Sequence, residues 1–503
     1  MCIRDRGWTG DAQIFSGTAC FNMDAYPFFR KYGHDLYSEQ KELDGKVPVI
    51  IPALHYHDMR STAWGEAATV IPWNLYLHYG NKAILEEQFE SMKGWVDFMR
   101  KEDIESGDRK LWTTGFHYGD WLALDGGFDN MPTGGTEVAY IASSYYSYSA
   151  GLVAKAAKVL GREEEAKKYG CLSEQIKEAV REEYFSPKGR LTIDTQTAYV
   201  VALYMDIVKE EWKERFVKDM RKRFEKDDNY LKTGFVGTPY LGRVLSGNGC
   251  NDIAYTLLMN DKFPSWLYEI SMGATTIWER WNSVLPDGKI SSTGMNSLNH
   301  YAYGSVVEWM YRDMAGINPV EDNPGFKRAV LAPKPDQRLG NVMADVNTAS
   351  GRYRSGWRLL DNQRVIFYFE VPFDAEADVF LPKVTKNGML INGKAADIGK
   401  EDESGVAFEL GAGKWEILCH VKEGFYHYYS TYDCIHELYK SDEAKKVLLE
   451  IVPGIEKLTS DIYVQSVREL SVNPTYLGVG PVPITEEILN ELDQRLGKIL
   501  KNL

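Results

Sequence analysis

Three segments of this 503-residue chain place an acid or a histidine directly among aromatic side chains. The first contains Trp8 and Asp11, the second Trp278 and Glu279, and the third His300. An indole ring offers a flat apolar wall to a sugar, and a carboxylate beside it can do acid–base chemistry. The chain also has 13 Trp, 31 Tyr and 20 Phe residues, so this composition indicates chemistry on glycosides.

Glu279 is the candidate for the carboxylate that activates water. Glycoside hydrolysis with inversion needs an acid for the leaving oxygen and a second carboxylate ~6.5–9.5 Å away. The flanking Trp278 and Trp281 predict an apolar environment, which raises a carboxylate pKa and suits a base working near neutral pH. The alternative is a structural ion pair between Glu279 and Arg280 or another arginine.

Two further segments repeat this pattern. In one, Asp120 is next to Trp121, and in the other, Trp64 is two residues before Glu66. Each residue alone has an ordinary explanation: Asp11 could stabilise a turn, and His300 could be a core histidine. Several acid–indole pairs on glycine-rich loops of one helical region favour a binding site, because such pairs do not build cores efficiently.

Metal and cofactor sites are not expected from the sequence. His55, His57 and Asp58 lie close together, but they lack a further ligand at a convincing spacing, which favours an ordinary polar loop. We find no P-loop, no G-x-S-x-G elbow and no dinucleotide fingerprint.

Net charge and cysteine spacing limit the classes of binding partner and the cellular compartment to be expected. The net charge of -14 argues against nucleic acid or an anionic membrane as partner, and no apolar run is long enough to span a bilayer. Six cysteines lie far apart without a CxxC pair, which suits a reducing, cytoplasmic compartment.

The hydrophobic periodicity predicts three parts. Residues 1–318 have a helical period, as in 85–99 and 166–180, and favour paired helical hairpins that close on themselves. A solenoid of stacked hairpins is the alternative, although no fixed-period repeat supports it. Residues 319–422 predict a small β-sandwich, with strands over 364–371, 375–381 and 415–421 and with turns at 387–388 and 392–393.

Residues 423–503 predict a helical tail with an apolar stripe behind a Thr485 N-cap. This tail either packs on the barrel or serves a partner subunit, so a homo-oligomer is one of the expectations.

Five stretches, taken together, resemble the α-L-rhamnosidases of glycoside hydrolase family 78. They are residues 7–13, 233–241, 264–268, 273–281 and 297–304, and they follow one another in the family's order. The resemblance implies a mostly α fold, an (α/α)6 six-hairpin barrel followed by the β-sandwich. It also implies an enzyme that removes terminal α-L-rhamnose from rhamnose-containing glycosides with inversion.

The resemblance also implies roles for single residues. Glu279 matches the general base, and Asp11 matches an acid that binds and orients the sugar. Aromatic walls and rim of the rhamnose pocket are assigned to Trp8, Asp58, Trp64, Asp120, Trp121, Trp278 and His300.

One departure from the family concerns the general acid, a glutamate seven residues before Asp11. That position holds Arg4 here, and the neighbouring Asp5 is shorter and out of register. We therefore expect a catalytic fragment, truncated at its N-terminus, that has the base and the pocket but lacks the proton donor. The alternatives are a non-catalytic carbohydrate-binding homologue and an (α/α)6 glycosidase with another sugar preference.

Overall fold

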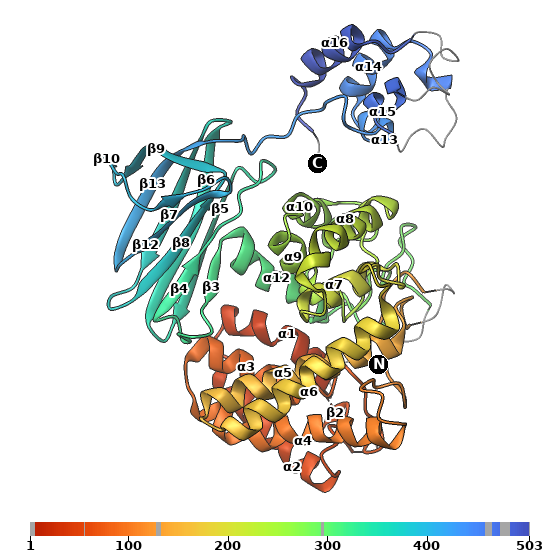
Figure 1. Cartoon of the computed structure of the whole chain (residues 1–503), viewed down its shortest axis with the longest axis vertical. Helices are drawn as coiled ribbons and strands as arrows, with labels where there is room; N and C mark the ends of the chain where they lie inside the picture. Colours follow the sequence, from red (N-terminus) through yellow and green to blue (C-terminus); the bar gives the residue numbers. More distant parts are fainter. Residues whose placement is uncertain are drawn as a thin grey trace.

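The computed structural model describes residues 6–54, 56–126, 132–292, 296–457, 465–472 and 483–501. A helical domain, a β-domain and a second, smaller group of helices follow one another along the chain. In Figure 1 the β-domain lies beside the helical domain, and the C-terminal helices form a separate group at the far end.

The helical domain is a closed ring of hairpins. In the described part of the chain the inner helices are α1 (Thr9–Asn22), α3 (Ala67–Tyr79), α5 (Val138–Val159), α7 (Gln196–Tyr204), α9 (Thr238–Gly247) and α12 (Val306–Trp309). Each inner helix contacts the next one, and α12 contacts α1. The ring is therefore closed, which confirms the six-hairpin barrel and rules out the solenoid.

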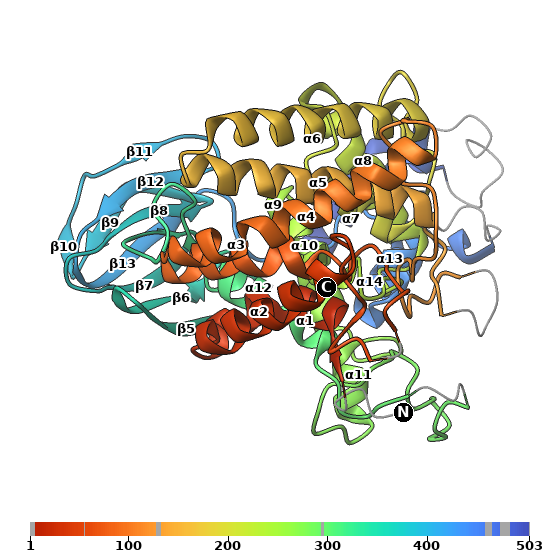
Figure 2. The ribbon, with the colours of Figure 1, turned by 90° about the horizontal axis from the view of Figure 1, so that it is seen from below.

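Among the described residues, five outer helices each follow an inner helix along the chain. They are α2 (Tyr26–Glu42), α4 (Ala83–Glu105), α6 (Glu163–Tyr184), α8 (Glu210–Lys226) and α10 (Asn251–Met259). Figure 2 shows α5 and α6 side by side as one such hairpin. The short helix α11 (Trp266–Ser271) follows and contacts α10, and η2 (Ala302–Ser305) and η3 (Met310–Met314) flank the last inner helix.

Burial explains which helices lie inside. The outer helix α8 buries a single stripe, Phe216, Met220 and Phe224, at helical spacing. The inner helix α1 is buried on nearly every face, including its polar residues Asp11 and Gln13. Polar side chains on the inner helices therefore point into the protein, where they need partners or a ligand.

The β-domain consists of two stacked sheets. One sheet contains β5 (Asn341–Thr348), β6 (Gly351–Asp361), β7 (Arg364–Val371), β9 (Val384–Ile391), β10 (Lys394–Ala395) and β13 (Gly413–Val421), in the order β10-β9-β13-β7-β6-β5. The other contains β3 (Ile317–Pro319), β4 (Arg328–Leu331), β8 (Glu376–Pro382), β11 (Lys400–Glu401) and β12 (Gly405–Leu410), in the order β11-β12-β8-β4-β3. Their inner faces share one apolar core.

The expected strands are present, and one expected turn is wrong. Asn392 and Gly393 form the turn between β9 and β10, both with positive φ. Asn387 and Gly388, however, lie inside β9. The pairing of β9 with β13 shifts register near His420, so Asn387 and Gly388 mark a β-bulge.

The barrel and the β-domain are joined through the C-terminal end of α1. Phe21 belongs to the core of the β-domain, where its ring stacks on Tyr311 at 4.8 Å and meets Phe326 edge-on at 6.4 Å. One helix thus carries Asp11 near its start and a β-domain core residue near its end.

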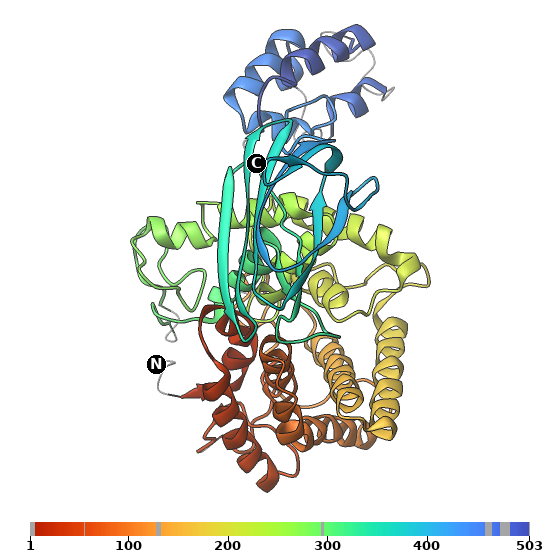
Figure 3. The same ribbon diagram turned by 90° about the vertical axis from the view of Figure 1, so that its left-hand side faces the viewer.

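The tail has its own apolar core and contains α13 (Ile435–Tyr439), α14 (Asp442–Ile451), η4 (Ile455–Lys457), α15 (Val467–Val472) and α16 (Glu486–Leu496). Thr485 caps α16 by accepting the Ile488 N–H, and Leu489, Leu492 and Leu496 are buried, as the sequence predicts. Figure 3 shows the tail helices above the β-sheets.

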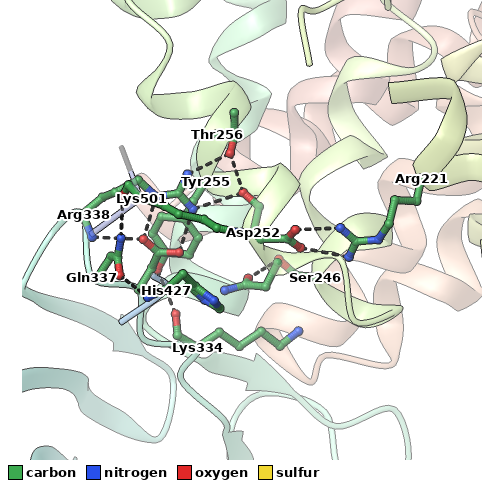
Figure 4. A network of polar contacts seen from close by, with 12 residues as sticks. Arg221, Ser246, Asp252, Tyr255, Thr256, Lys334, Gln337, Arg338, His427 and Lys501 are labelled. Carbon is green, nitrogen blue, oxygen red and sulfur yellow. Dashed lines mark hydrogen bonds and ion pairs between the residues drawn. The ribbon is translucent and has the colours of Figure 1, made fainter. Parts of the chain in front are cut away.

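A polar network joins the three parts (Figure 4). Arg338 donates to Thr256 Oγ1 (2.8 Å) and to the Asp252 carbonyl (3.1 Å) on α10, and it pairs with Asp336 at 2.7 Å. Next to it, Gln337 donates to the Lys501 carbonyl of the tail at 2.9 Å. The short linker between β4 and β5 therefore touches both the barrel and the tail.

None of the described helices combines the length and apolar character needed to cross a bilayer.

We predict that Arg338→Met lowers the free energy of unfolding by about 3–5 kcal/mol, because it leaves the Asp336 carboxylate buried and unpaired. Urea unfolding followed by tryptophan fluorescence measures this change. The control is Arg328→Met on β4, whose partners Glu376, Asp378 and Glu409 lie on a solvated face. That change should cost about 1 kcal/mol or less, and equal losses would contradict the prediction.

Candidate active site

The candidate site lies where the ring of inner helices closes. The short strand β1 (Gly7–Trp8) pairs with β2 (Ile50–Ile51) and leads directly into α1. Asp11 lies in the first turn of this helix. The element η2, which contacts α1, follows His300 directly along the chain. Residues from the two ends of the helical domain thereby become neighbours.

Asp11 and His300 form a buried pair, with 3.0 Å between Asp11 Oδ1 and His300 Nε2. The Ala302 N–H donates to His300 Nδ1 at 3.1 Å, so Nδ1 is the acceptor and Nε2 carries the proton of the neutral ring. Phe235 packs on the histidine ring at 5.5 Å. Asp11 thus lies in a helix and not in a turn, whereas the buried position of His300 is compatible with both a core histidine and a binding residue.

Glu279 is buried beside this pair. Burial raises the pKa of Glu279 above its ordinary value, the charge of Asp11 adds to the increase, and His300 opposes it. Glu279 Oε2 has no hydrogen-bond partner among the described residues. A buried carboxylate with a raised pKa and a free oxygen is suited to accept a proton from water.

The structural ion pair considered for Glu279 does not form. Arg280 is buried, yet no ion pair within 4.0 Å joins it to Glu279 or to any other carboxylate that the structure describes. Its Nη1 lacks a hydrogen-bond partner among these residues, and burial lowers the pKa of its guanidinium.

Aromatic rings line the same region. Tyr118 lies at the centre, with its ring 4.4 Å from Trp64, 4.9 Å from Trp121 and 6.5 Å from Trp8. The indole nitrogens of Trp8 and Trp64 are buried without partners in the described region. Gly10 packs against the Trp64 indole, where a Cβ would lie 2.5 Å from Cε2. The first turn of α1 and the Trp64 ring are therefore in direct contact.

Asp120, one of the predicted binding residues, is fully buried, and its binding role stays a prediction. Its carboxylate accepts the backbone N–H groups of Gly234 (2.9 Å), Val236 (2.8 Å) and Gly237 (3.2 Å), and it also accepts the Thr197 hydroxyl. Burial raises its pKa to about 6, while these hydrogen bonds oppose the rise. Both oxygens are engaged, which favours a role in holding the loop that carries Phe235 over direct contact with a sugar.

Two other predicted binding residues, Asp58 and Trp278, have side-chain neighbours other than Asp11 and His300. Asp58 is fully exposed, and its carboxylate is 3.7 Å from Lys46. Trp278 is buried and packs edge-on with Tyr268 at 6.4 Å. Their binding roles stay predictions. His55 lies outside the described residues.

Sequence reasoning missed Tyr118, Phe235 and Glu269. Tyr118 and Phe235 occur in segments that the sequence singles out, so proximity to Asp120 and to the 233–241 stretch was an available signal. Glu269, on α11, directly follows Tyr268 and adjoins the 264–268 stretch, so its aromatic neighbours were an available signal. Its position near the base segment emerges only from the fold.

A search of the described residues for clusters of three or more His, Cys, Asp or Glu that could hold a metal ion finds none.

The fold and these residues define a six-hairpin glycosidase barrel with a C-terminal β-domain. Residues 4–314 match the bacterial alpha-L-rhamnosidase six-hairpin glycosidase domain, and residues 316–396 match the bacterial alpha-L-rhamnosidase C-terminal domain. The chain therefore belongs to the bacterial α-L-rhamnosidase family.

Individual relatives agree with this membership. An alpha-L-rhamnosidase of Formosa agariphila is 34% identical over 82% of this chain and 44% of its own length, and one of Alteromonas sp. is 36% identical over 75% and 40%. The crystal structure of the Streptomyces avermitilis alpha-L-rhamnosidase complexed with L-rhamnose matches with a TM-score of 0.74 and 32% identity, over 82% of this chain and 38% of that one. The chain thus spans less than half the length of these relatives.

We predict that Asp120→Ala lowers the unfolding free energy by about 3 kcal/mol or more, because it leaves three buried backbone N–H groups without an acceptor. Thermal unfolding gives the loss. The control Asp125→Ala removes the side-chain oxygen that accepts one backbone N–H, that of Gly135 at 2.8 Å, and should cost about 1 kcal/mol. Weakened sugar binding by Asp120→Ala with unchanged stability would instead indicate direct contact with the ligand.

Proposed function

We propose that this chain hydrolyses terminal α-L-rhamnosides with inversion of configuration and that Glu279 is the general base. The observation that supports this most directly is the burial of Glu279 beside the Asp11–His300 pair, in a domain that matches the rhamnosidase family. The rhamnose bound to the Streptomyces avermitilis relative supports the same sugar specificity here.

Each residue has a chemical role in this proposal. Glu279, in its ionised form, takes a proton from the water that attacks the anomeric carbon. Asp11, held by His300, accepts hydrogen bonds from sugar hydroxyls and orients the ring. Trp8 and Trp64 supply apolar surface against the ring faces.

The leaving oxygen needs a proton from a second group. The family's acid position corresponds to Arg4, which lies outside the described residues. An arginine keeps its proton at neutral pH and cannot act as a general acid there. We propose that hydrolysis by this chain is limited by departure of the aglycone.

A second candidate function is carbohydrate binding without turnover. Arg4 at the acid position is the specific observation that favours it. Rhamnose binding measured by calorimetry together with the absence of any rhamnoside hydrolysis would support this alternative.

We predict that Glu279→Gln retains L-rhamnose binding while kcat falls by on the order of 10²–10⁴, because the amide cannot take a proton from water. In the parent protein, the acidic limb of the kcat profile should lie above the ordinary glutamate pKa of 4.5, since burial raises the pKa of the base. Calorimetry and initial rates measure these effects. Glu214→Gln, at an exposed ion pair on α8, is the control, and near-normal turnover by Glu279→Gln would reject the assignment.

We also predict a steep dependence of the rate on the leaving group. A dinitrophenyl α-L-rhamnoside, whose aglycone is already acidic, should react at a measurable rate, while an alkyl rhamnoside should react far more slowly. The physical reason is that an acidic phenol departs without protonation and an alcohol does not. Comparable kcat/KM values for the two substrates would show that another residue supplies the proton.

A further inference from the structure

The segment that carries Glu279 is tied on one side to the segment that carries His300. The Thr276 hydroxyl donates to the Leu298 carbonyl (2.6 Å), and the His300 N–H donates to the Ile277 carbonyl (2.8 Å). The Glu279 N–H donates to the Ser297 carbonyl at 2.9 Å. Three hydrogen bonds thus join the segment that carries Glu279 to the segment that carries His300.

Trp278, which lies between Ile277 and Glu279, is held by a different residue, Glu269. The buried backbone N–H of Trp278 donates to Glu269 Oε2 at 3.2 Å. The Glu269 backbone carbonyl also accepts the Ala274 N–H at 3.0 Å, so one residue holds the segment at two points. Without the Glu269 carboxyl, the Trp278 N–H would be buried and unsatisfied, which is costly.

The short helix α11, which carries Glu269, is itself anchored. Ser265 caps it by accepting the Tyr268 N–H, and Trp266 Nε1 donates to the Tyr303 carbonyl at 3.0 Å. Trp266 also packs edge-on against Trp281 at 5.1 Å. The helix therefore contacts the chain shortly after Glu279, at Trp281, and shortly after His300, at Tyr303.

We propose that Glu269 is a positioning residue for the general base: it fixes the backbone at Trp278 and so determines where the adjacent Glu279 carboxylate lies. This inference rests on the proposed function. A displacement of about 1 Å at a reacting group can cost ~10²-fold in rate, so loss of this anchor acts on turnover more than on binding.

Glu269 performs this role as a neutral acid. Burial raises the pKa of Glu269 to about 8, and the hydrogen bond from Trp278 only partly opposes the increase. The carboxyl is therefore protonated at neutral pH, and its carbonyl oxygen is the acceptor. Glutamine has the same shape, no charge and a carbonyl in the same place, which makes it the appropriate rescue variant.

The test compares Glu269→Ala with Glu269→Gln on a dinitrophenyl α-L-rhamnoside, a substrate that does not depend on the general acid. Glu269→Ala should lower kcat at least tenfold at pH 7 with KM changed less than threefold, and Glu269→Gln should restore kcat to within threefold of the parent. The matched control is Tyr268→Phe on the same helix, which removes one hydrogen bond, to the Val284 carbonyl, and should leave kcat unchanged. Retained kcat in Glu269→Ala, or equal losses in the Ala and Gln variants, would overturn the proposal.

Amide hydrogen exchange of the peptide covering residues 274–281 tests the anchor without turnover. Glu269→Ala should lose protection in this peptide while the rest of the barrel keeps it, and Glu269→Gln should retain it. Unchanged protection in Glu269→Ala would reject the positioning role. An inactive parent with the expected exchange pattern would reject the proposed function and leave the anchor established.

Discussion

Closure of the helical ring is the constraint on which the site depends. Asp11 enters with the first inner helix, and His300 comes just before the last one, so their 3.0 Å contact exists only when α12 meets α1. Glu279 belongs to the same late segment and feels the Asp11 charge through this closure. A barrel that failed to close would separate Asp11 from His300, which links formation of the site to cooperative folding of the whole domain.

Two of the three proposed active-site residues, Glu279 and His300, lie on loops, and buried carboxyl groups hold the loops of this region in place. Asp120 gathers three backbone N–H groups of the 234–237 turn, and Glu269 holds the backbone next to Glu279. Surface connections are usually the most mobile parts of a fold. Here the loop backbone donates hydrogen bonds to buried carboxyl groups, Asp120 on a neighbouring loop and Glu269 on α11, so these contacts do not depend on the side chains of the residues that they hold. Under the proposed function, the acids of this barrel divide into those that face the sugar and those that hold the chain.

The sequence was sufficient for the architecture because each layer leaves a pattern. The α8 stripe of Phe216, Met220 and Phe224 and the alternating β7 strand are visible as periodicity, and the family motifs located Asp11, Glu279 and His300. Side-chain partners leave no such pattern. Asp120 looks the same in the sequence whether its oxygens face a sugar or three backbone amides, and the Asn387–Gly388 pair reads as a turn although it forms a bulge inside β9. Only tertiary contacts separate these cases.

The placement of Phe21 bears on how this enzyme family can be cut or recombined. The helix that carries Asp11 in its first turn has, in its last turn, the Phe21 ring inserted in the core of the β-domain, against Tyr311 and Phe326. Removing the β-domain would expose that ring together with its apolar neighbours, and an exposed aromatic cluster of this kind promotes aggregation. The barrel is therefore not an interchangeable module. A chimera that exchanges β-domains between relatives must exchange the last turn of α1 with them.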